Sequence, residues 1–267
     1  MVVGIKKSWG FTVAWIAFVL VFFYSPIVSL MVFSFNNSRS LTSWSGFSLQ
    51  WYQALFENRE MMAAITTTLS IALLSTFVST VVGTLTAIGI SKSRRLIKEL
   101  ILNVNNFPIL NPEIVTAIGF MLLYTTLNIE KGYWTMLIAH IAFSTPYVIL
   151  TVLPKLRRLD PDLAEAALDL GCTPLGALTK VIVPLIMPGV ISGALIAFTM
   201  SFDDFVISYF VSGNGVKNIS ILVYTMSKRI NPTINALSTI LVVIITVVLL
   251  IVNLYPIFKK GNQKVTE

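Results

Sequence analysis

Three acidic residues lie inside long apolar stretches of the chain, where an ionised side chain is costly. Glu113 stands in one stretch, and Asp203 and Asp204 are adjacent in another. An ionised acid at the centre of a bilayer costs about 2.5–3.5 kcal/mol on insertion scales, so such residues are rare and seldom face lipid. They can bind a cation in a translocation pathway, pair with a cation of a partner subunit, or carry a proton.

Aromatic rings and hydroxyl groups in the same stretches favour an organic ammonium ion as the cation. A carboxylate binds an ammonium by charge, and an aromatic face adds a cation–π contact. An anion carrier would instead place arginines or helix N-termini at this depth. A sugar carrier would place amides and aromatic rings without the charges. The predicted substrate-pathway residues are Glu113, Asp203, Asp204, Ser201, Trp51 and Tyr147.

Six apolar segments are long enough to hold these residues across a membrane, because the hydrocarbon core requires about 20 residues of helix. The chain of 267 residues is 55% hydrophobic and 12% charged, whereas soluble domains contain about 25% charged residues. We therefore predict an all-α membrane protein with six transmembrane helices. The expected spans cover residues 11–33, 64–90, 100–124, 133–153, 188–211 and 236–258.

The basic residues between these segments predict the orientation, because Lys and Arg concentrate in short cytoplasmic loops. The formal net charge of +7 reflects this asymmetry and does not indicate the sign of the substrate. One side holds Lys6, Lys7, Lys92, Arg94, Arg95, Lys98, Lys155, Arg157, Arg158, Lys180, Lys259, Lys260 and Lys264. The other side holds Arg39, Arg59, Lys131, Lys217, Lys228 and Arg229. Both termini are therefore expected in the cytoplasm.

Small residues and prolines predict how the spans pack and bend. Small residues at four-residue intervals let helices approach closely in lipid. Such ridges occur at Ser75, Ser79, Gly83 and Ala87, and again at Gly189, Gly193, Ala197 and Ser201. Pro112 predicts a kink in the third span, and residues 144–147 predict a polar break in the fourth. Residues 49–60 are expected to form a short amphipathic helix on the outer surface.

A polar run at about 157–187 is expected in the cytoplasm, between the fourth and fifth spans. Asp160 suits a helix N-cap, Pro161 suits the first helical position, and Gly171 suits the position just past the helix end. Thr173 and Pro174 predict the start of a second short helix, which Pro184 and Pro188 would close.

The first of these two helices places Leu163, Ala166, Ala167 and Leu170 on one face. A helix this short is not stable alone in water, so something must cover that apolar face. The cover is either the bilayer surface or a groove in a cytosolic partner.

Glu165-Ala166-Ala167, followed after three residues by Gly171 and then by Val181-x-Val183-Pro184, resembles the EAA loop of ABC-importer permease subunits. That family prefers Ile and Leu where this chain has its two valines. The resemblance implies a type I (MetI-like) fold, with one transmembrane permease domain over residues 1–267. It also implies a coupling helix seated in a cleft of a separate ATPase. The residues it assigns to ATPase coupling are Glu165, Ala166, Ala167, Leu170, Gly171 and Pro184.

The segments Ser201-Phe202-Asp203-Asp204-Phe205-Val206 and Asn231-Pro232-x-Ile234-Asn235-Ala236 are similar to those of polyamine permeases of the PotC type. Members of that family often have Asp where this chain has Glu113. The resemblance implies a multi-pass permease subunit for spermidine or putrescine in the bacterial inner membrane. Its implied partners are a second, different permease subunit, two cytosolic ATPases and an extracytoplasmic polyamine-binding protein. No cofactor or metal is implied.

Three other functions stay open at this point. A permease of the same class could carry another organic cation or small solute. A proton-coupled secondary transporter could use the same acids, but it would leave the EAA spacing unexplained. An intramembrane enzyme is the weakest alternative, because Cys172 and His140 are the only cysteine and histidine. His140 is expected to be packed or in polar contact. The chain contains no GxxxxGK[ST] phosphate loop, so we expect no ATPase site of its own.

Overall fold

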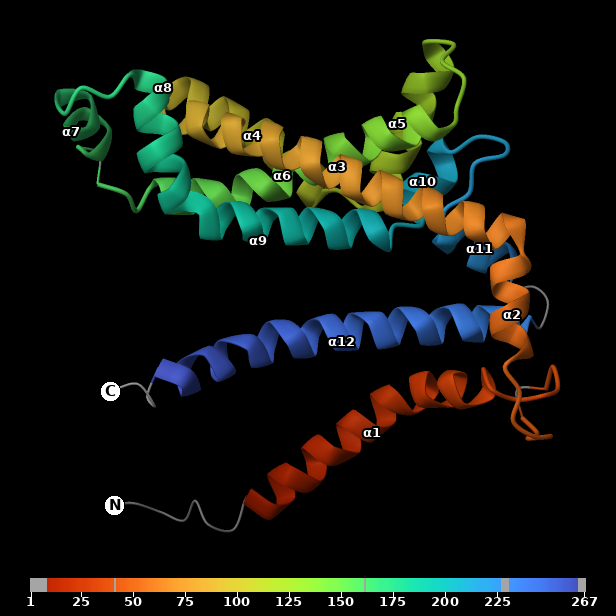
Figure 1. Cartoon of the computed structure of the whole chain (residues 1–267). Coiled ribbons are helices and arrows are strands. Elements are labelled where there is room, and N and C mark those ends of the chain that lie inside the picture. Colours follow the sequence, from red (N-terminus) through yellow and green to blue (C-terminus); the bar gives the residue numbers. More distant parts are fainter. Residues whose placement is uncertain (1–8, 41, 161, 227–230, 264–267) are drawn as a thin grey trace. The chain divides into compact units, whose positions relative to one another are not determined.

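The computed structural model describes residues 9–40, 42–160, 162–226 and 231–263, except the side chains of residues 9, 248, 249 and 252–263. The described residues are all-α, with one isolated antiparallel bridge between Asn36 and Phe47. The elements (Figure 1) are α1 (Trp9–Phe33), α2 (Gln50–Glu57), α3 (Arg59–Lys92), α4 (Arg95–Leu110), α5 (Glu113–Thr126), α6 (Tyr133–Leu156), α7 (Leu163–Asp169), α8 (Pro174–Ala177), the π-helical turn η2 (Leu178–Ile182), α9 (Val183–Phe202), α10 (Val206–Val211), α11 (Ile219–Met226) and α12 (Pro232–Gln263).

Four helical stretches are long and apolar enough to cross a membrane. They are α1, α3, α6 and the stretch Pro174–Phe202 that α8, η2 and α9 form together. A fifth span results if α4 and α5 are counted as one. These stretches match the first five predicted spans. The sixth predicted span, 236–258, belongs to α12 and includes residues whose side chains are not described.

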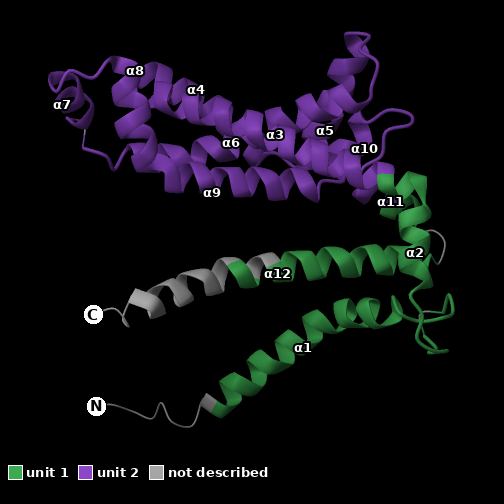
Figure 2. Ribbon diagram, viewed as in Figure 1, with its two compact units in different colours: residues 1–62, 223–267 green, residues 63–222 purple. Residues whose placement is uncertain are grey.

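The chain divides into two compact units (Figure 2). Unit 1 comprises residues 1–62 and 223–267, and unit 2 comprises residues 63–222. In unit 1, α1 and α2 both pack against α12. The short helix predicted at residues 49–60 is confirmed as α2, and its place on the outer surface stays a prediction. The single permease domain expected over the whole chain stays a prediction.

Helix α6 packs closely against both α9 and α3 in unit 2, because glycines face it from either side. A methyl group added at Gly193 of α9 would lie 2.5 Å from Thr151 Oγ1. A methyl group added at Gly83 of α3 would lie 2.7 Å from Val148 Cβ. Only residues without a side chain allow such contacts. The two predicted ridges are therefore confirmed as packing surfaces.

The ends of unit 2 carry different elements. Helices α7 and α8 lie at one end, while α5 and α10 lie at the other (Figure 1). Helix α9 runs between them, and its 20 residues extend about 30 Å at 1.5 Å per residue. The polar loop and the carboxylates thus lie at opposite ends of the same bundle.

The third and fourth predicted spans differ in how their prolines act. Helices α4 and α5 meet at an angle of 106° around Asn111 and Pro112, so the predicted kink is confirmed and is large. Helix α6, in contrast, continues through Pro146, and the predicted break at 144–147 is wrong. Ser144, Pro146 and Val148 are all buried, and packing around them holds the helix despite the missing N–H.

The fifth predicted span, 188–211, is wrong at both ends. The helical stretch begins at Pro174, and it stops at Phe202. Pro184 does not close a helix, because the π-helical turn η2 precedes it and the chain continues into α9. A proline ring collides with the carbonyl four residues earlier, and a wider turn just before it relieves that collision.

Candidate functional site

Two adjacent aspartates lie in the break between α9 and α10, in different surroundings. Asp204 is buried, with 4% of its surface exposed, whereas Asp203 is exposed. The helical spacing assumed for Ser201, Asp204 and Ser208 does not apply, because the three are not on one continuous helix. They are nevertheless all buried in the same polar cluster.

The carboxylate of Asp204 caps α10. Its Oδ1 accepts the backbone N–H of Ile207 at 3.2 Å, and its Oδ2 accepts that of Ser208 at 2.7 Å. The first N–H groups of a helix have no partner within the helix, and a carboxylate at that end also suits the helix dipole. Asp204 therefore stabilises the start of α10 and is not free in solvent.

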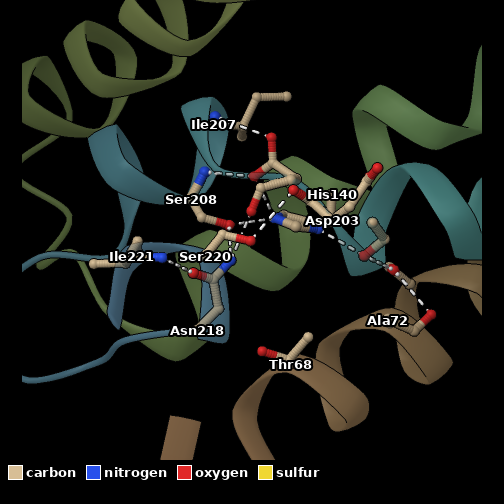
Figure 3. Close-up of polar contacts among 12 residues, drawn as sticks. Thr68, Ala72, His140, Asp203, Ile207, Ser208, Asn218, Ser220 and Ile221 are labelled. Atoms are coloured by element: carbon tan, nitrogen blue, oxygen red, sulfur yellow. Dashed lines mark hydrogen bonds and ion pairs between the residues drawn. The ribbon is translucent and has the colours of Figure 1, made fainter. Parts of the chain in front are cut away.

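His140 of α6 lies at the centre of this cluster (Figure 3) and is 1% exposed. Its Nδ1 lies 2.7 Å from Ser201 Oγ, at the end of α9. Its Nε2 lies 3.0 Å from Ser208 Oγ and 3.3 Å from Asp204 Oδ2. Ser201 Oγ also accepts a hydrogen bond from Ser75 Oγ of α3 at 2.9 Å. One imidazole thus joins the helices on both sides of the break.

Asn218 closes the cluster from the segment before α11. Its Nδ2 donates to the Asp204 carbonyl at 2.8 Å and to Ser208 Oγ at 2.9 Å. Its Oδ1 accepts the backbone N–H of Ile221 at 2.9 Å (Figure 3). The carbonyl and the carboxylate of Asp204 are therefore both held by buried hydrogen bonds, and such bonds are costly to leave unmade.

Glu113 is the first residue of α5, directly after the 106° bend, and it is exposed. Helix α5 packs against α10, and the Glu113 carboxyl lies near the Asp204 carboxyl. Tyr147 of α6 is half-buried, packs edge-on against Phe143 at 5.7 Å between ring centroids, and lies near Glu113. Two exposed carboxyls therefore lie beside a buried one, with a phenol close by.

This arrangement suits the binding of a cation rather than catalysis. The fully described helices α5, α9 and α10 contain no Lys or Arg that could neutralise the acids. Among the described residues, no group of three or more His, Cys, Asp and Glu side chains is placed to hold a metal ion. A mobile cation with hydrogen-bond donors, such as an ammonium, is the ligand that these groups can bind.

The predicted pathway residues divide into three sets. Glu113, Asp203 and Tyr147 lie together at the surface of the cluster, and Asp204 and Ser201 lie inside it. Trp51 belongs to unit 1, where its indole N–H donates to the Asn36 carbonyl at 2.7 Å.

Sequence reasoning gave no role to Asn218, and it treated Ser75 only as a packing residue and His140 only as a packed or polar one. Nothing in their spacing indicates a shared network.

Helix α7 of the predicted coupling segment is preceded by a turn and ends with a Schellman motif. Helix α7 starts after Asp162, so the N-cap predicted at Asp160 is wrong by two residues; Asp160 Oδ1 instead accepts the Asp162 N–H at 3.0 Å. Gly171 has a φ of +84° and confirms the predicted stop. Its N–H bonds the Leu168 carbonyl at 2.9 Å. The N–H of the following residue bonds the Ala167 carbonyl at 3.0 Å. The role predicted for Pro161 lies outside the described residues.

The apolar face predicted for α7 is divided between the chain itself and solvent. Ala167 is buried and Leu163 is half-buried, whereas Ala166 and Leu170 are exposed, Leu170 by 87%. Glu165 is exposed as well. Thr173 confirms its predicted capping role, because its Oγ1 accepts the Gly176 N–H at 3.1 Å. A cavity of about 440 Å³ lies between these short helices and the ends of α3 and α6.

The chain matches a known family over most of its length. Residues 79–258 match the family described as binding-protein-dependent transport system inner membrane component. The chain is 37% identical over 243 residues to the spermidine/putrescine transport system permease protein PotC of Escherichia coli (strain K12), covering 90% of this chain and 92% of that protein. It is 34% identical over 250 residues to the putrescine transport system permease protein PotI of the same strain, covering 89% and 86%.

A solved structure shares the fold at low sequence identity. It is the crystal structure of a bacterial ABC transporter involved in the import of the acidic polysaccharide alginate. The TM-score is 0.70 with 15% identity, and the match covers 97% of this chain and 99% of that chain. This match supports the all-α permease fold.

Proposed function

The chain belongs to the family of binding-protein-dependent transport system inner membrane components, and we propose on that premise that it is the permease subunit of an ATP-driven importer of spermidine or putrescine. It is a multi-pass protein of the inner membrane and has no catalytic role of its own. Relatives named for polyamine transport cover about nine-tenths of it.

The observation that carries the choice of substrate is the meeting of three carboxyl groups, one at the start of α5 and two in the break between α9 and α10. Glu113 and Asp203 are exposed, and the buried Asp204 lies beside Glu113. Adjacent carboxylates repel each other unless a proton or a cation lies with them. A polyamine brings several ammonium groups, which can bind such acids by charge-assisted hydrogen bonds. Tyr147 adds an aromatic face beside these acids. Trp51 stays a pathway residue predicted from the sequence, and its indole N–H is bonded within unit 1.

The remaining architecture follows from the fold and the EAA-like segment. Six transmembrane helices, with both termini in the cytoplasm, form half of the pore. A second permease subunit completes the pore, two ATPases drive it, and an extracytoplasmic binding protein delivers the polyamine. Helix α7 docks in the ATPase through Glu165, Ala166 and Leu170, with Ala167 packed behind them. Gly171 ends that helix and Pro184 stands at the start of α9. Closure of the ATPases moves this segment and alternates access to the carboxylates.

The test is uptake of radiolabelled spermidine and putrescine in cells that lack their own polyamine transporters. The chain is expressed with its partner permease and binding protein, with and without the cognate ATPase. We expect saturable uptake of one or both polyamines only when the ATPase is present. Uptake without the ATPase would indicate a secondary transporter, and absence of polyamine uptake in an assembled, ATP-hydrolysing complex would overturn the substrate assignment.

A further inference from the structure

His140 is a buried group that contacts both sides of the break in which the two aspartates lie. Its imidazole bonds Ser201 at the end of α9, and it contacts Ser208 and Asp204 at the start of α10. Because α9 stops at Phe202 and α10 starts at Val206, no helical hydrogen bonds cross this gap to fix its geometry. Side-chain contacts must therefore determine which aspartate faces outward.

A neutral imidazole with its hydrogen on Nε2 satisfies the contacts around His140. Both oxygens of Asp204 already accept backbone N–H groups, so they act as acceptors toward the imidazole as well. With its hydrogen on Nε2, the imidazole can donate to Asp204, while Nδ1 accepts a hydrogen bond. Ser75 donates to Ser201, which leaves the Ser201 hydroxyl hydrogen for Nδ1. Each of the three donors then has an acceptor: Ser75 of α3, Ser201 of α9 and His140 of α6.

We infer that His140 is a positioning residue for substrate binding: it holds Asp204 inward so that Asp203 is presented to the substrate beside Glu113. The two aspartates are adjacent in sequence, yet one is 4% exposed and the other is exposed. Without the imidazole, Asp204 loses its side-chain contact to α6, and Ser201 loses its link to α10. The break can then relax, and the exposed acids no longer hold one spacing for the ammonium groups. This role rests on the proposed cation pathway.

The test uses the complete transporter complex in proteoliposomes and measures the half-saturating spermidine concentration, the maximal uptake rate and ATP hydrolysis. In His140→Ala, we expect the half-saturating concentration to rise about tenfold, as for the loss of a buried hydrogen bond to a charged group. In His140→Gln, the amide can still donate to Asp204, so the rise should be within about threefold, which tests rescue by a conservative variant.

Thr135→Val is the matched control, because Thr135 is also buried on α6 and also bonds a helix flanking the cluster. Its hydroxyl donates to the Val211 carbonyl at 2.9 Å, away from the aspartates. A merely structural effect would lower thermal stability in both variants and change the half-saturating concentration in neither. An equal rise in Thr135→Val and His140→Ala, or no rise in His140→Ala, would overturn the inference. If His140→Ala does not assemble, His140→Asn replaces it in this comparison, because the shorter amide takes the place of Nδ1 and does not reach Asp204.

Asp203→Asn separates this inference from the proposed pathway. If Asp203→Asn leaves uptake unchanged, the pathway assignment itself fails. If Asp203→Asn impairs uptake while His140→Ala does not, only the positioning role fails. The double variant should show a smaller rise than the product of the two single rises, because residues that act through one another are not additive.

Discussion

The two ends of unit 2 are constructed in opposite ways, although α9 connects them. At the carboxylate end, buried side chains bond one another, and His140, Ser201, Ser208 and Asp204 are each at most 4% exposed. At the α7 end, short helices line a cavity, and they present Leu170 and Leu175 with 87% and 69% of their surfaces exposed.

This difference indicates what each end has to do. A helix as short as α7 needs packing contacts to be stable, and its exposed leucines are apolar surface that a partner could cover. A buried polar network whose hydrogen bonds are satisfied makes the residues that form it rigid, so the carboxylate end is held in one arrangement. We interpret the first end as the part that receives force and the second as the part that holds a substrate site.

The largest effect is expected from changing Gly171 to valine. A β-branched residue at a φ of +84° is strained by about 1–2 kcal/mol. This strain favours a change of the backbone that would break the two capping hydrogen bonds of α7. We expect loss of ATPase co-purification and at least about a tenfold fall in uptake. Nothing lies within 4 Å of the position where a Cβ would be placed, so crowding is not the cause. Gly171→Asn is the control, because asparagine tolerates this conformation. Normal docking in Gly171→Val would contradict the assigned role of α7.

A second comparison changes the charge of an exposed acid at the other end. Glu113→Gln should raise the half-saturating polyamine concentration about tenfold, because one charge-assisted hydrogen bond is lost. Glu113→Asp keeps the charge and serves as the control. ATPase co-purification should be unaffected in both variants. A weakened ATPase contact in Glu113→Gln would show that the two ends are not functionally separate.

The helix packing between the ends can be tested with Gly193→Ala. The added methyl group would lie 2.5 Å from Thr151 Oγ1, and overpacking of this kind costs about 1–3 kcal/mol. Thermal unfolding of the purified complex should occur at a lower temperature. Gly119→Ala in α5 is the control, since no atom lies within 4 Å of the added methyl group. Equal stability of the two variants would refute the tight contact between α6 and α9.

The smallest effect is expected from Thr173→Ala. Loss of the N-cap bond to Gly176 should cost about 1 kcal/mol locally, and it should weaken ATPase docking only severalfold. Thr173→Ser retains the capping oxygen and should behave as the unmodified chain does. A Thr173→Ala variant that binds the ATPase normally would mean that α8 is not part of the docking surface.

Sequence alone predicted the features that one residue type can determine locally. Gly171 occupies a conformation that favours glycine, Pro112 marks the sharp bend, and the glycines of α3 and α9 mark close helix contacts. Prediction from the sequence failed where contacts with distant residues determine the local structure. Pro146 leaves α6 unbroken because its neighbours hold the helix. At the end of α9, Ser201 and Asp204 bond to His140 and Asn218 from other parts of the chain.

The acids illustrate the same limit. Their presence at membrane depth indicated a cation, but their spacing could not show that Asp204 is used internally. That distinction depends on the buried contacts to Ile207, Ser208 and His140, which join residues from two elements across a break that the helical period did not predict.

The most direct test of the account is spermidine uptake by the complete complex that carries Asp203→Asn, measured together with ATPase co-purification. We predict that the ATPase stays bound while the half-saturating spermidine concentration rises about tenfold or more. Unchanged uptake with the ATPase bound would contradict the central claim that the exposed carboxylates at this end of unit 2 hold the substrate.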